Sequence, residues 1–177
     1  MEEVRKKPRK PKKLPVCLSS DEFVELIKHT RKEIHKLAFL LGFASGLRIS
    51  EITSLEPRHI DMNAKKILIE LGKGSKDRVV PLPKAFKTKH LNMLPLKITP
   101  RGLQKAFKLA CKRAGLLEIK PTLHFHSLRH GFATQSIEKG VPLNQVQIAL
   151  GHSNVATTGI YLRANPKDML NSYEELF

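Results

Sequence analysis

Hydrophobic residues recur with the spacing of an α-helix along most of this chain, and with the spacing of a β-strand in only one short region. Between about residues 58 and 81 the period changes to two, as in the run Lys65-Lys-Ile-Leu-Ile-Glu70. A period of two places successive side chains on opposite faces of a strand, whereas a period near 3.6 places them on one helix face. The sequence therefore predicts a mainly α fold with a small three-stranded antiparallel β-sheet, in the α+β class.

Turn-forming residues divide the expected strands, with Asn63 after the first and Gly72-Lys-Gly-Ser75 after the second. Gly46 and Gly115 follow apolar helical patterns and are placed to end two helices. The stretch from 84 to 100 is short and is expected to lack a helix and connecting segment before the helix that begins at 100. The expected strands cover about 59–62, 65–70 and 78–80, and the expected helices about 20–29, 31–46, 50–55, 100–114, 128–138, 143–150, 156–161 and 166–176.

The chain carries a large excess of positive charge. Its 177 residues, a length typical of one domain, contain 32 Lys and Arg against 16 Asp and Glu, for a formal net charge of +16. Residues 1–13 contribute +5 and the remainder +11, so the folded part itself should present a basic face. Such an excess favours a polyanionic partner, and nucleic acid is the leading one. We expect a basic, proline-containing arm or linker over 1–17, with a merely solubilising tail as its alternative, and one folded domain over 18–177.

Two further features bear on where the protein works. Cys17 and Cys111 show no motif spacing and are expected to be free thiols, which favours a reducing compartment. The apolar stretches are too short to span a bilayer, and the N-terminus does not resemble a secretory leader. We therefore expect a cytoplasmic protein without a membrane partner.

The densest polar cluster is His124-Phe-His126-Ser-Leu-Arg129-His130. His126 and His130 lie one helical turn apart, a spacing that can hold a metal ion. Against a metal site, no Cys or carboxylate lies nearby in sequence, and Arg129 would repel a cation. A second alternative is that one or two of these histidines only cap or pack the helix.

A second cluster is Leu150-Gly-His152-Ser-Asn154, which is followed nine residues later by Tyr161. Taken alone, this cluster is a helix terminus and Tyr161 is a half-buried aromatic residue. Together with Arg48, Lys73, His126 and Arg129, however, it completes an ordered set of cations, proton carriers and one hydroxyl.

Four segments containing these residues resemble the motifs of the tyrosine recombinases, or phage integrase family, and most closely its Xer-type prokaryotic branch. The resemblance extends over about 18–171 and keeps the family order, and it implies the fold of a tyrosine recombinase catalytic domain. The segments are Ala44-Ser-Gly-Leu-Arg48-Ile-Ser-Glu51, Gly72-Lys73-Gly-Ser-Lys76-Asp-Arg78, His126-Ser-Leu-Arg129-His130-Gly-Phe-Ala-Thr134 and Leu150-Gly-His152-Ser-Asn-Val-Ala-Thr-Thr158-Gly-Ile-Tyr161.

The resemblance implies a role for each of six catalytic residues. Arg48 and Arg129 match the two arginines that grip the scissile phosphate, and guanidinium groups suit this task because they bind phosphate oxygens bidentately. Tyr161 resembles the nucleophile, whose pKa of about 10 requires a base or a positive field at neutral pH. His126 is the candidate acceptor of its proton, and Lys73 the candidate general acid for the leaving 5′ oxygen, with Lys76 in reserve. His152 matches the second family histidine, and the only other tyrosine, Tyr173, is interpreted as packing.

The implied activity is site-specific DNA recombination or integration, in which strands are cut and rejoined through a 3′-phosphotyrosyl intermediate. The resemblance implies double-stranded DNA as the partner and no ATP, Mg²⁺ or other cofactor. Alternatives are a DNA-binding module without productive catalysis, since a preceding clamp domain is absent from this chain, and a type IB topoisomerase-like relaxing activity. Many relatives form tetramers on paired sites by exchanging a C-terminal segment. Residues 166–177 are such a segment or a helix docked on their own domain, and a monomer is expected without DNA.

Overall fold

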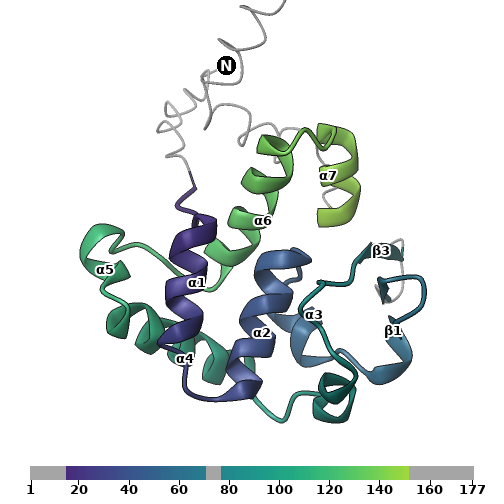
Figure 1. Ribbon diagram of the computed structural model, residues 1–177, viewed down its shortest axis with the longest axis horizontal. Helices are drawn as coiled ribbons and strands as arrows, with labels where there is room; N and C mark the ends of the chain where they lie inside the picture. Colours follow the sequence, from purple (N-terminus) through teal and green to yellow (C-terminus); the bar gives the residue numbers. More distant parts are fainter. Residues whose placement is uncertain (1–14, 71–76, 152–177) are drawn as a thin grey trace, which may run out of the picture.

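The computed structural model describes residues 15–70 and 77–151, which form seven α-helices, two 3₁₀ helices and one three-stranded sheet (Figure 1). The strands β1, β2 and β3 lie in the order of the sequence and pair antiparallel. The expected fold class is therefore confirmed. The elements are α1 (Ser20–Lys28), α2 (Glu33–Ala44), α3 (Ile49–Thr53), η1 (Pro57–His59), β1 (Ile60–Asp61), β2 (Lys66–Ile69), β3 (Arg78–Pro81), η2 (Thr88–Met93), α4 (Pro100–Arg113), α5 (Leu116–Ile119), α6 (His126–Glu138) and α7 (Leu143–Leu150).

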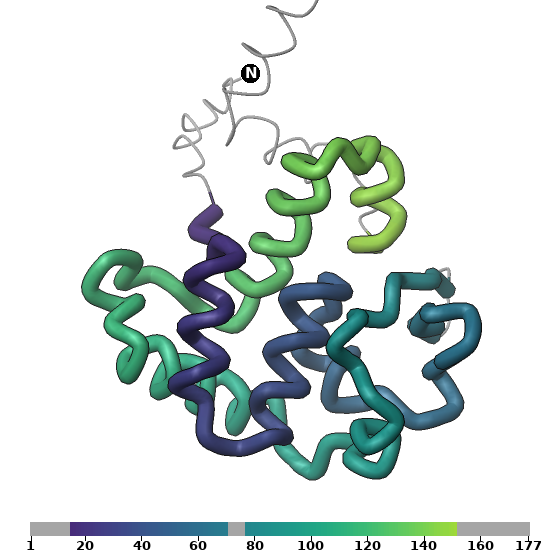
Figure 2. Tube along the Cα trace, in the orientation of Figure 1, coloured from purple at the N-terminus to yellow at the C-terminus, as the bar shows by residue number. Residues whose placement is uncertain are grey.

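The core is built around α2, which is apolar on nearly all sides. Its Leu37, Phe39 and Leu41 are at most 2% exposed. The Phe39 ring meets Phe107 of α4 edge-on at a centroid distance of 5.5 Å, and Phe125 before α6 at 6.0 Å. In Figure 2 the trace of α2 accordingly runs between α1 on one side and the strands on the other.

The sheet has one buried and one exposed face. Ile67 and Val80 are paired and buried, whereas the next pair, Leu68 and Val79, is 38% and 50% exposed. The same alternation turns Arg78, the first residue of β3, toward the interior, where it is 6% exposed. A charged side chain therefore occupies an inward position that period-two patterning normally assigns to an apolar residue.

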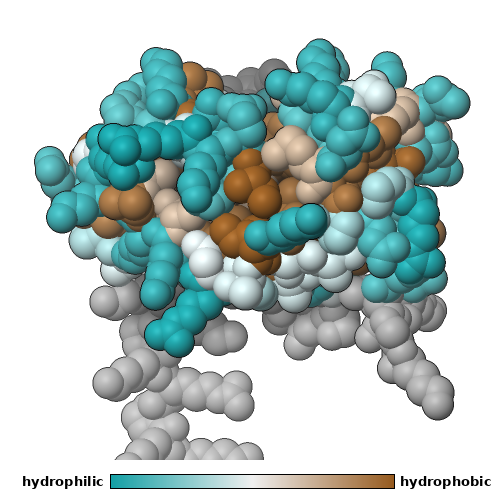
Figure 3. Space-filling model, turned by 90° about the horizontal axis from the view of Figure 1, so that it is seen from below, coloured by the Kyte–Doolittle hydropathy of each residue, from teal (hydrophilic) through white to brown (hydrophobic). Residues whose placement is uncertain are grey.

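Helix α4 is amphipathic, as expected from its sequence. Thr99 caps it by accepting a hydrogen bond from the Gly102 N–H at 3.1 Å, and Pro100 occupies its first position. Leu103, Phe107 and Ala110 are buried, whereas Lys105, Lys108, Lys112 and Arg113 are exposed. The face seen from below in Figure 3 combines hydrophilic side chains with an apolar area near its middle.

Helices α6 and α7 form a small second cluster beside the main core. Ala133 of α6 and Val146 and Leu150 of α7 are buried together, and Phe132 and Ile137 pack against them. This arrangement brings the C-terminal end of α7 next to β3 and to the turn between α2 and α3.

The two cysteines and the segment before α4 are as the sequence predicts. Cys17 and Cys111 are free thiols, and burial raises the pKa of Cys111 to about 12. Residues 82–99 contain the 3₁₀ helix η2 and no α-helix. None of the helices in the described ranges combines the length and the apolar character that a bilayer crossing needs. The expected helices over 156–161 and 166–176 lie outside the described residues, as does the arm up to residue 14.

Candidate active site

Arg48 stands at the turn that joins α2 to α3. Gly46 ends α2 with a φ of +66°, a left-handed conformation that glycine adopts without strain. A Cβ atom at this position would lie 2.5 Å from Phe132 Cδ1 and 3.1 Å from Leu150 Cδ2. Glycine is therefore required here both for the turn and for close packing against α6 and α7.

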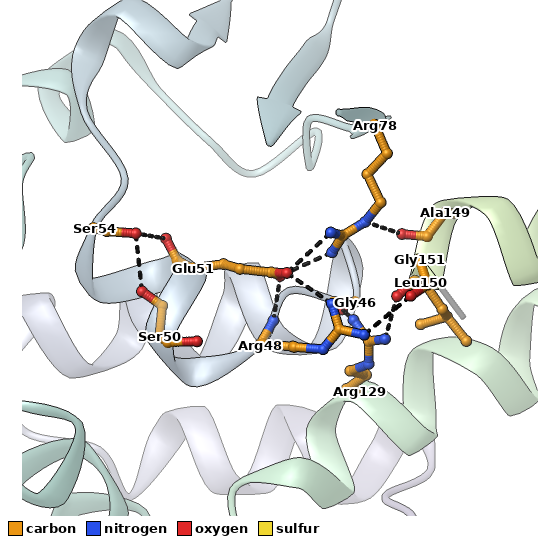
Figure 4. Close-up of polar contacts among 10 residues, drawn as sticks. All are labelled: Gly46, Arg48, Ser50, Glu51, Ser54, Arg78, Arg129, Ala149, Leu150 and Gly151. Atoms are coloured by element: carbon orange, nitrogen blue, oxygen red, sulfur yellow. Dashed lines mark hydrogen bonds and ion pairs between the residues drawn. The ribbon is translucent and has the colours of Figure 1, made fainter. Parts of the chain in front are cut away.

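The Arg48 side chain is held from two directions (Figure 4). Its Nη1 donates to Glu51 Oε1 at 2.9 Å, and its Nη2 donates to the Gly151 carbonyl oxygen at 3.2 Å. The Arg48 backbone N–H donates to Glu51 Oε2 at 2.7 Å, which caps α3. These hydrogen bonds fix the orientation of the guanidinium. Because the side chain remains 33% exposed, the guanidinium is still open to an anion from solvent.

Arg129 enters the same site from the first turn of α6, and it is only 4% exposed. Its Nη1 donates to the Gly46 carbonyl oxygen at 2.7 Å, and its Nη2 donates to the Leu150 carbonyl oxygen. The two arginines predicted to grip a phosphate are therefore brought together by the ends of α2 and α7 (Figure 4).

A third arginine, Arg78, completes this arrangement. Its Nη1 and Nη2 donate to the two Glu51 oxygens at 2.9 and 2.8 Å, and its Nε donates to the Ala149 carbonyl oxygen at 2.8 Å. Three consecutive carbonyl groups at the end of α7 thus each accept from a different arginine. Carbonyls at a helix C-terminus lack intrahelical donors and carry partial negative charge, so they suit cations.

Glu51 is the only carboxylate among these contacts within the described ranges, and it is 9% exposed. Burial by itself would raise the pKa of Glu51. Hydrogen bonds from Arg78 and from the Arg48 backbone outweigh that effect and lower this pKa below its usual value. Glu51 is therefore ionised at neutral pH.

His126 is the first residue of α6 and is exposed at the mouth of the site. Partial burial, followed by the positive charge of Arg129, lowers its pKa. The imidazole is consequently neutral at pH 7 and can accept a proton.

The rings of His124, His126 and His130 form a loose triangle, with centroid distances of 6.3 Å from 124 to 126, 6.1 Å from 124 to 130 and 6.3 Å from 126 to 130. Across the described residues, no group of three or more His, Cys, Asp and Glu side chains is arranged to hold a metal ion. His124 instead belongs to a local network with Ser127, whose Oγ lies 3.2 Å from His124 Nδ1.

The structure thus brings together three of the six residues predicted from the sequence, Arg48, His126 and Arg129. The other three, Lys73, His152 and Tyr161, lie outside the described residues. The arrangement brings together two oriented guanidinium groups and a neutral imidazole, which suits a phosphodiester that gains negative charge during substitution.

Sequence reasoning missed two members of the site. Glu51 and Arg78 stand inside the motifs already described, but the sequence analysis assigned them no role. For Glu51 a signal existed, because a Glu three residues after a helix-capping position commonly reaches back to the cap. For Arg78 the signal was its position two residues before Val80, which predicts that both face the same side of the strand.

Comparison with known proteins agrees with this geometry. Residues 17–94 and 95–168 match the model of the phage integrase family. The chain belongs to this family.

Several of the similar proteins are Xer recombinases. The tyrosine recombinase XerA of Pyrococcus horikoshii is 32% identical over 188 residues, which cover 96% of this chain and 64% of that protein. A crystal structure of XerA recombinase superposes with a TM-score of 0.75 at 27% identity, covering 95% of this chain and 66% of that one. The XerH site-specific recombinase bound to its palindromic difH substrate gives a TM-score of 0.72 at 26% identity, covering 92% and 53%. The chain therefore spans less than two thirds of the length of these relatives.

Proposed function

We propose that this chain is the catalytic part of a site-specific DNA recombinase or integrase, which cuts and rejoins strands through a 3′-phosphotyrosyl intermediate. The observation that carries the proposal is the convergence of Arg48 and Arg129, from segments far apart in the sequence, onto one set of carbonyls beside His126. A charged pair built in this way supplies preorganised stabilisation for the oxygens of a scissile phosphate.

In the proposed reaction the Tyr161 oxygen attacks the phosphorus, and the bond to the 5′ oxygen of the next nucleotide breaks. Arg48 and Arg129 bind the non-bridging oxygens throughout. His126 accepts the phenolic proton, and Lys73 delivers a proton to the leaving 5′ oxygen. His152 adds a further hydrogen bond to the phosphate. Reversal of these steps by the 5′ hydroxyl of another strand completes the exchange, and no metal ion is needed.

The proposed partner is double-stranded DNA, as in the substrate-bound structure of the similar XerH recombinase. We further propose that residues 18–177 form the catalytic domain, that the basic arm over 1–17 adds phosphate contacts, and that four copies assemble on two paired sites. Light scattering of the protein with and without duplexes carrying a cleavable site tests the last point. A DNA-dependent change from monomer to tetramer is the expected result.

The central test is trapping of the covalent intermediate on nicked suicide duplexes, from which the released fragment diffuses away. We expect the wild-type chain to form an adduct that survives denaturing electrophoresis. Tyr161→Phe removes one oxygen and keeps the ring, so it should abolish the adduct while DNA binding persists. Tyr173→Phe is the matched control and should leave the adduct in place.

Other outcomes would identify a different function. DNA binding without an adduct on any candidate site would favour a binding module with the recombinase fold. Relaxation of supercoiled plasmid that lacks a recombination site would favour a topoisomerase-like activity on a single duplex. Adduct formation by Tyr161→Phe would assign the nucleophile to another residue.

A further inference from the structure

Arg78 is a deeply buried charged residue of the site, with 4% of its side chain exposed. It comes from β3, whereas the residues it binds belong to α3 and α7. Its three hydrogen bonds use the terminal nitrogens and Nε together, so the planar guanidinium is fixed in one orientation. Because all three guanidinium nitrogens of Arg78 donate to protein acceptors, we assign this residue a role within the protein and not a contact with DNA.

We propose that Arg78 is a positioning residue for strand cleavage, which orients Arg48 through Glu51 and holds the last turn of α7 in place. The proposal rests on the proposed function and adds to it a residue that does not touch the substrate. It predicts that Arg78 affects the rate of cleavage more than the affinity for DNA.

The first part of the mechanism is electrostatic. Glu51 carries one negative charge and binds two guanidinium groups, so the three side chains together keep a net charge of +1. Without Arg78, both oxygens of Glu51 would accept hydrogen bonds from Arg48 alone. The negative charge of Glu51 would then cancel the positive charge of Arg48. Arg78 therefore leaves the positive charge of Arg48 available to a phosphate.

The second part is steric and concerns Gly151. This residue has a φ of +60°, and a Cβ atom here would lie 3.1 Å from Arg78 Cδ and 3.2 Å from Arg78 Nη1. The Arg78 side chain therefore packs directly on the peptide whose carbonyl group accepts the hydrogen bond from Arg48. Through this contact Arg78 sets the position of the acceptor as well as that of the carboxylate.

The test compares Arg78→Met with Arg58→Met. Both variants lose one guanidinium, but Arg58 is 65% exposed and pairs with Glu56 and Glu70 on the neighbouring surface. Single-turnover adduct formation on suicide duplexes gives the cleavage rate, and fluorescence anisotropy gives DNA affinity. We expect Arg78→Met to cleave about 10²-fold more slowly, the scale of a misplaced reacting group. Its DNA affinity should match that of Arg58→Met.

A double-mutant cycle tests whether Arg78 acts through Glu51. We expect Arg78→Met to cost much less in a Glu51→Gln background than in the wild type, because the carboxylate whose charge it balances is already gone. Equal costs in the two backgrounds would overturn the proposal.

The pH profile supplies a readout that a purely structural role would not move. Removing Arg78 removes the strongest interaction that lowers the pKa of Glu51, so this pKa rises. Glu51 then takes up a proton at a higher pH, so the inflection of the cleavage rate that follows the ionisation of Glu51 should lie at a higher pH than in the wild type. The other charged or titratable groups facing Glu51 are Arg48 and His126, whereas Glu56, Arg58, His59 and Glu70 line the adjoining polar cavity.

The outcomes separate this proposal from the proposed function. If the wild type forms no adduct, the proposed function fails. If the wild type does and Arg78→Met equals Arg58→Met in rate, only the positioning role fails. A parallel loss of rate and affinity would make Arg78 a DNA contact and also overturn the proposal. Should Arg78→Met unfold, Arg78→Lys keeps the charge without the fork, and full activity of that variant would exclude the proposed geometry.

Discussion

Arg48 and Arg129 are chemically identical, but their surroundings give them different tasks. Arg129 is buried and satisfies carbonyl groups of both α2 and α7, so it holds the protein together as well as facing the site. Arg48 is one third exposed, and its contacts chiefly fix its own orientation. Losing one or the other should therefore have different effects on stability.

Replacing Arg129 with alanine should reduce both cleavage and stability. Loss of one transition-state donor costs about 10²-fold or more in rate, and each buried carbonyl left without a donor costs about 1–3 kcal/mol of folding free energy. Arg48→Ala should show a similar loss of rate with the smaller loss of stability. Suicide-substrate kinetics and urea unfolding of both variants measure the two quantities. Equal destabilisation by the two substitutions would contradict the structural role assigned to Arg129.

The lowered pKa of His126 makes a prediction about pH. If neutral His126 accepts the tyrosine proton, cleavage should fall on acidification through the pKa of this histidine, at a midpoint below the ordinary value of about 6.5. The rate of adduct formation between pH 5 and 8 measures that midpoint. His124→Asn is the control, because it alters a neighbouring ring without removing the proposed acceptor. A midpoint above 6.5 in the wild type would exclude His126 as this group.

At the scale of elements, the site depends on how closely α2, α6 and α7 approach one another at Gly46. Gly46→Ala should destabilise the protein, since the new methyl group would collide with Phe132. Gly115→Ala is a matched control, because Gly115 has nearly the same φ, +68°, and no neighbouring atom within 4 Å of the added Cβ. The two variants share the backbone strain, so the difference between their unfolding free energies isolates the collision, about 1–3 kcal/mol. Equal losses of unfolding free energy in the two variants, measured by urea denaturation, would show that the Phe132 side chain moves aside and no collision remains.

Long amphipathic elements could be predicted from the sequence, whereas the short helix α5 could not. Helices α1, α4 and α7 were predicted from the sequence because each has an apolar face toward the core and a polar face toward solvent over two or more turns. The four-residue α5, Leu116–Ile119, gave no periodic signal and was missed. The strands were located, but the burial of Arg78 depends on partners in α3 and α7 that period-two patterning cannot specify.

The site was predictable only in its side chains. Arg48, His126 and Arg129 lie in recognisable sequence motifs, and the structure places them together. Their catalytic roles stay predictions. Apart from the Glu51 carboxylate, the acceptors that orient the arginines are backbone oxygens of residues 46, 149, 150 and 151. Every residue type has such an oxygen, so its use as a ligand depends on the tertiary fold and leaves no mark in the sequence.

At the scale of the whole molecule, the excess of positive charge should dominate binding to DNA. We expect the lysines and arginines exposed on α4, together with those of the basic arm, to supply phosphate contacts. If about six to ten phosphates are neutralised, affinity should fall roughly 10³- to 10⁵-fold between about 50 and 200 mM salt. Anisotropy titrations at several salt concentrations measure the slope, and deletion of residues 1–13 should make it shallower without removing it. A flat dependence would contradict an electrostatic mode of binding.

The three carbonyl groups at the end of α7 also have a consequence for folding. They accept hydrogen bonds from Arg78 of β3, from Arg48 just before α3 and from Arg129 of α6. The guanidinium groups of Arg48 and Arg129 therefore acquire their orientation only when segments up to about 100 residues apart in sequence have docked. Helix α7 rests on a small satellite cluster, and such peripheral units open at a lower free energy than the main core. We therefore expect a partly folded or locally opened chain to keep its positive charge but to lack the arrangement that the proposed strand cleavage needs.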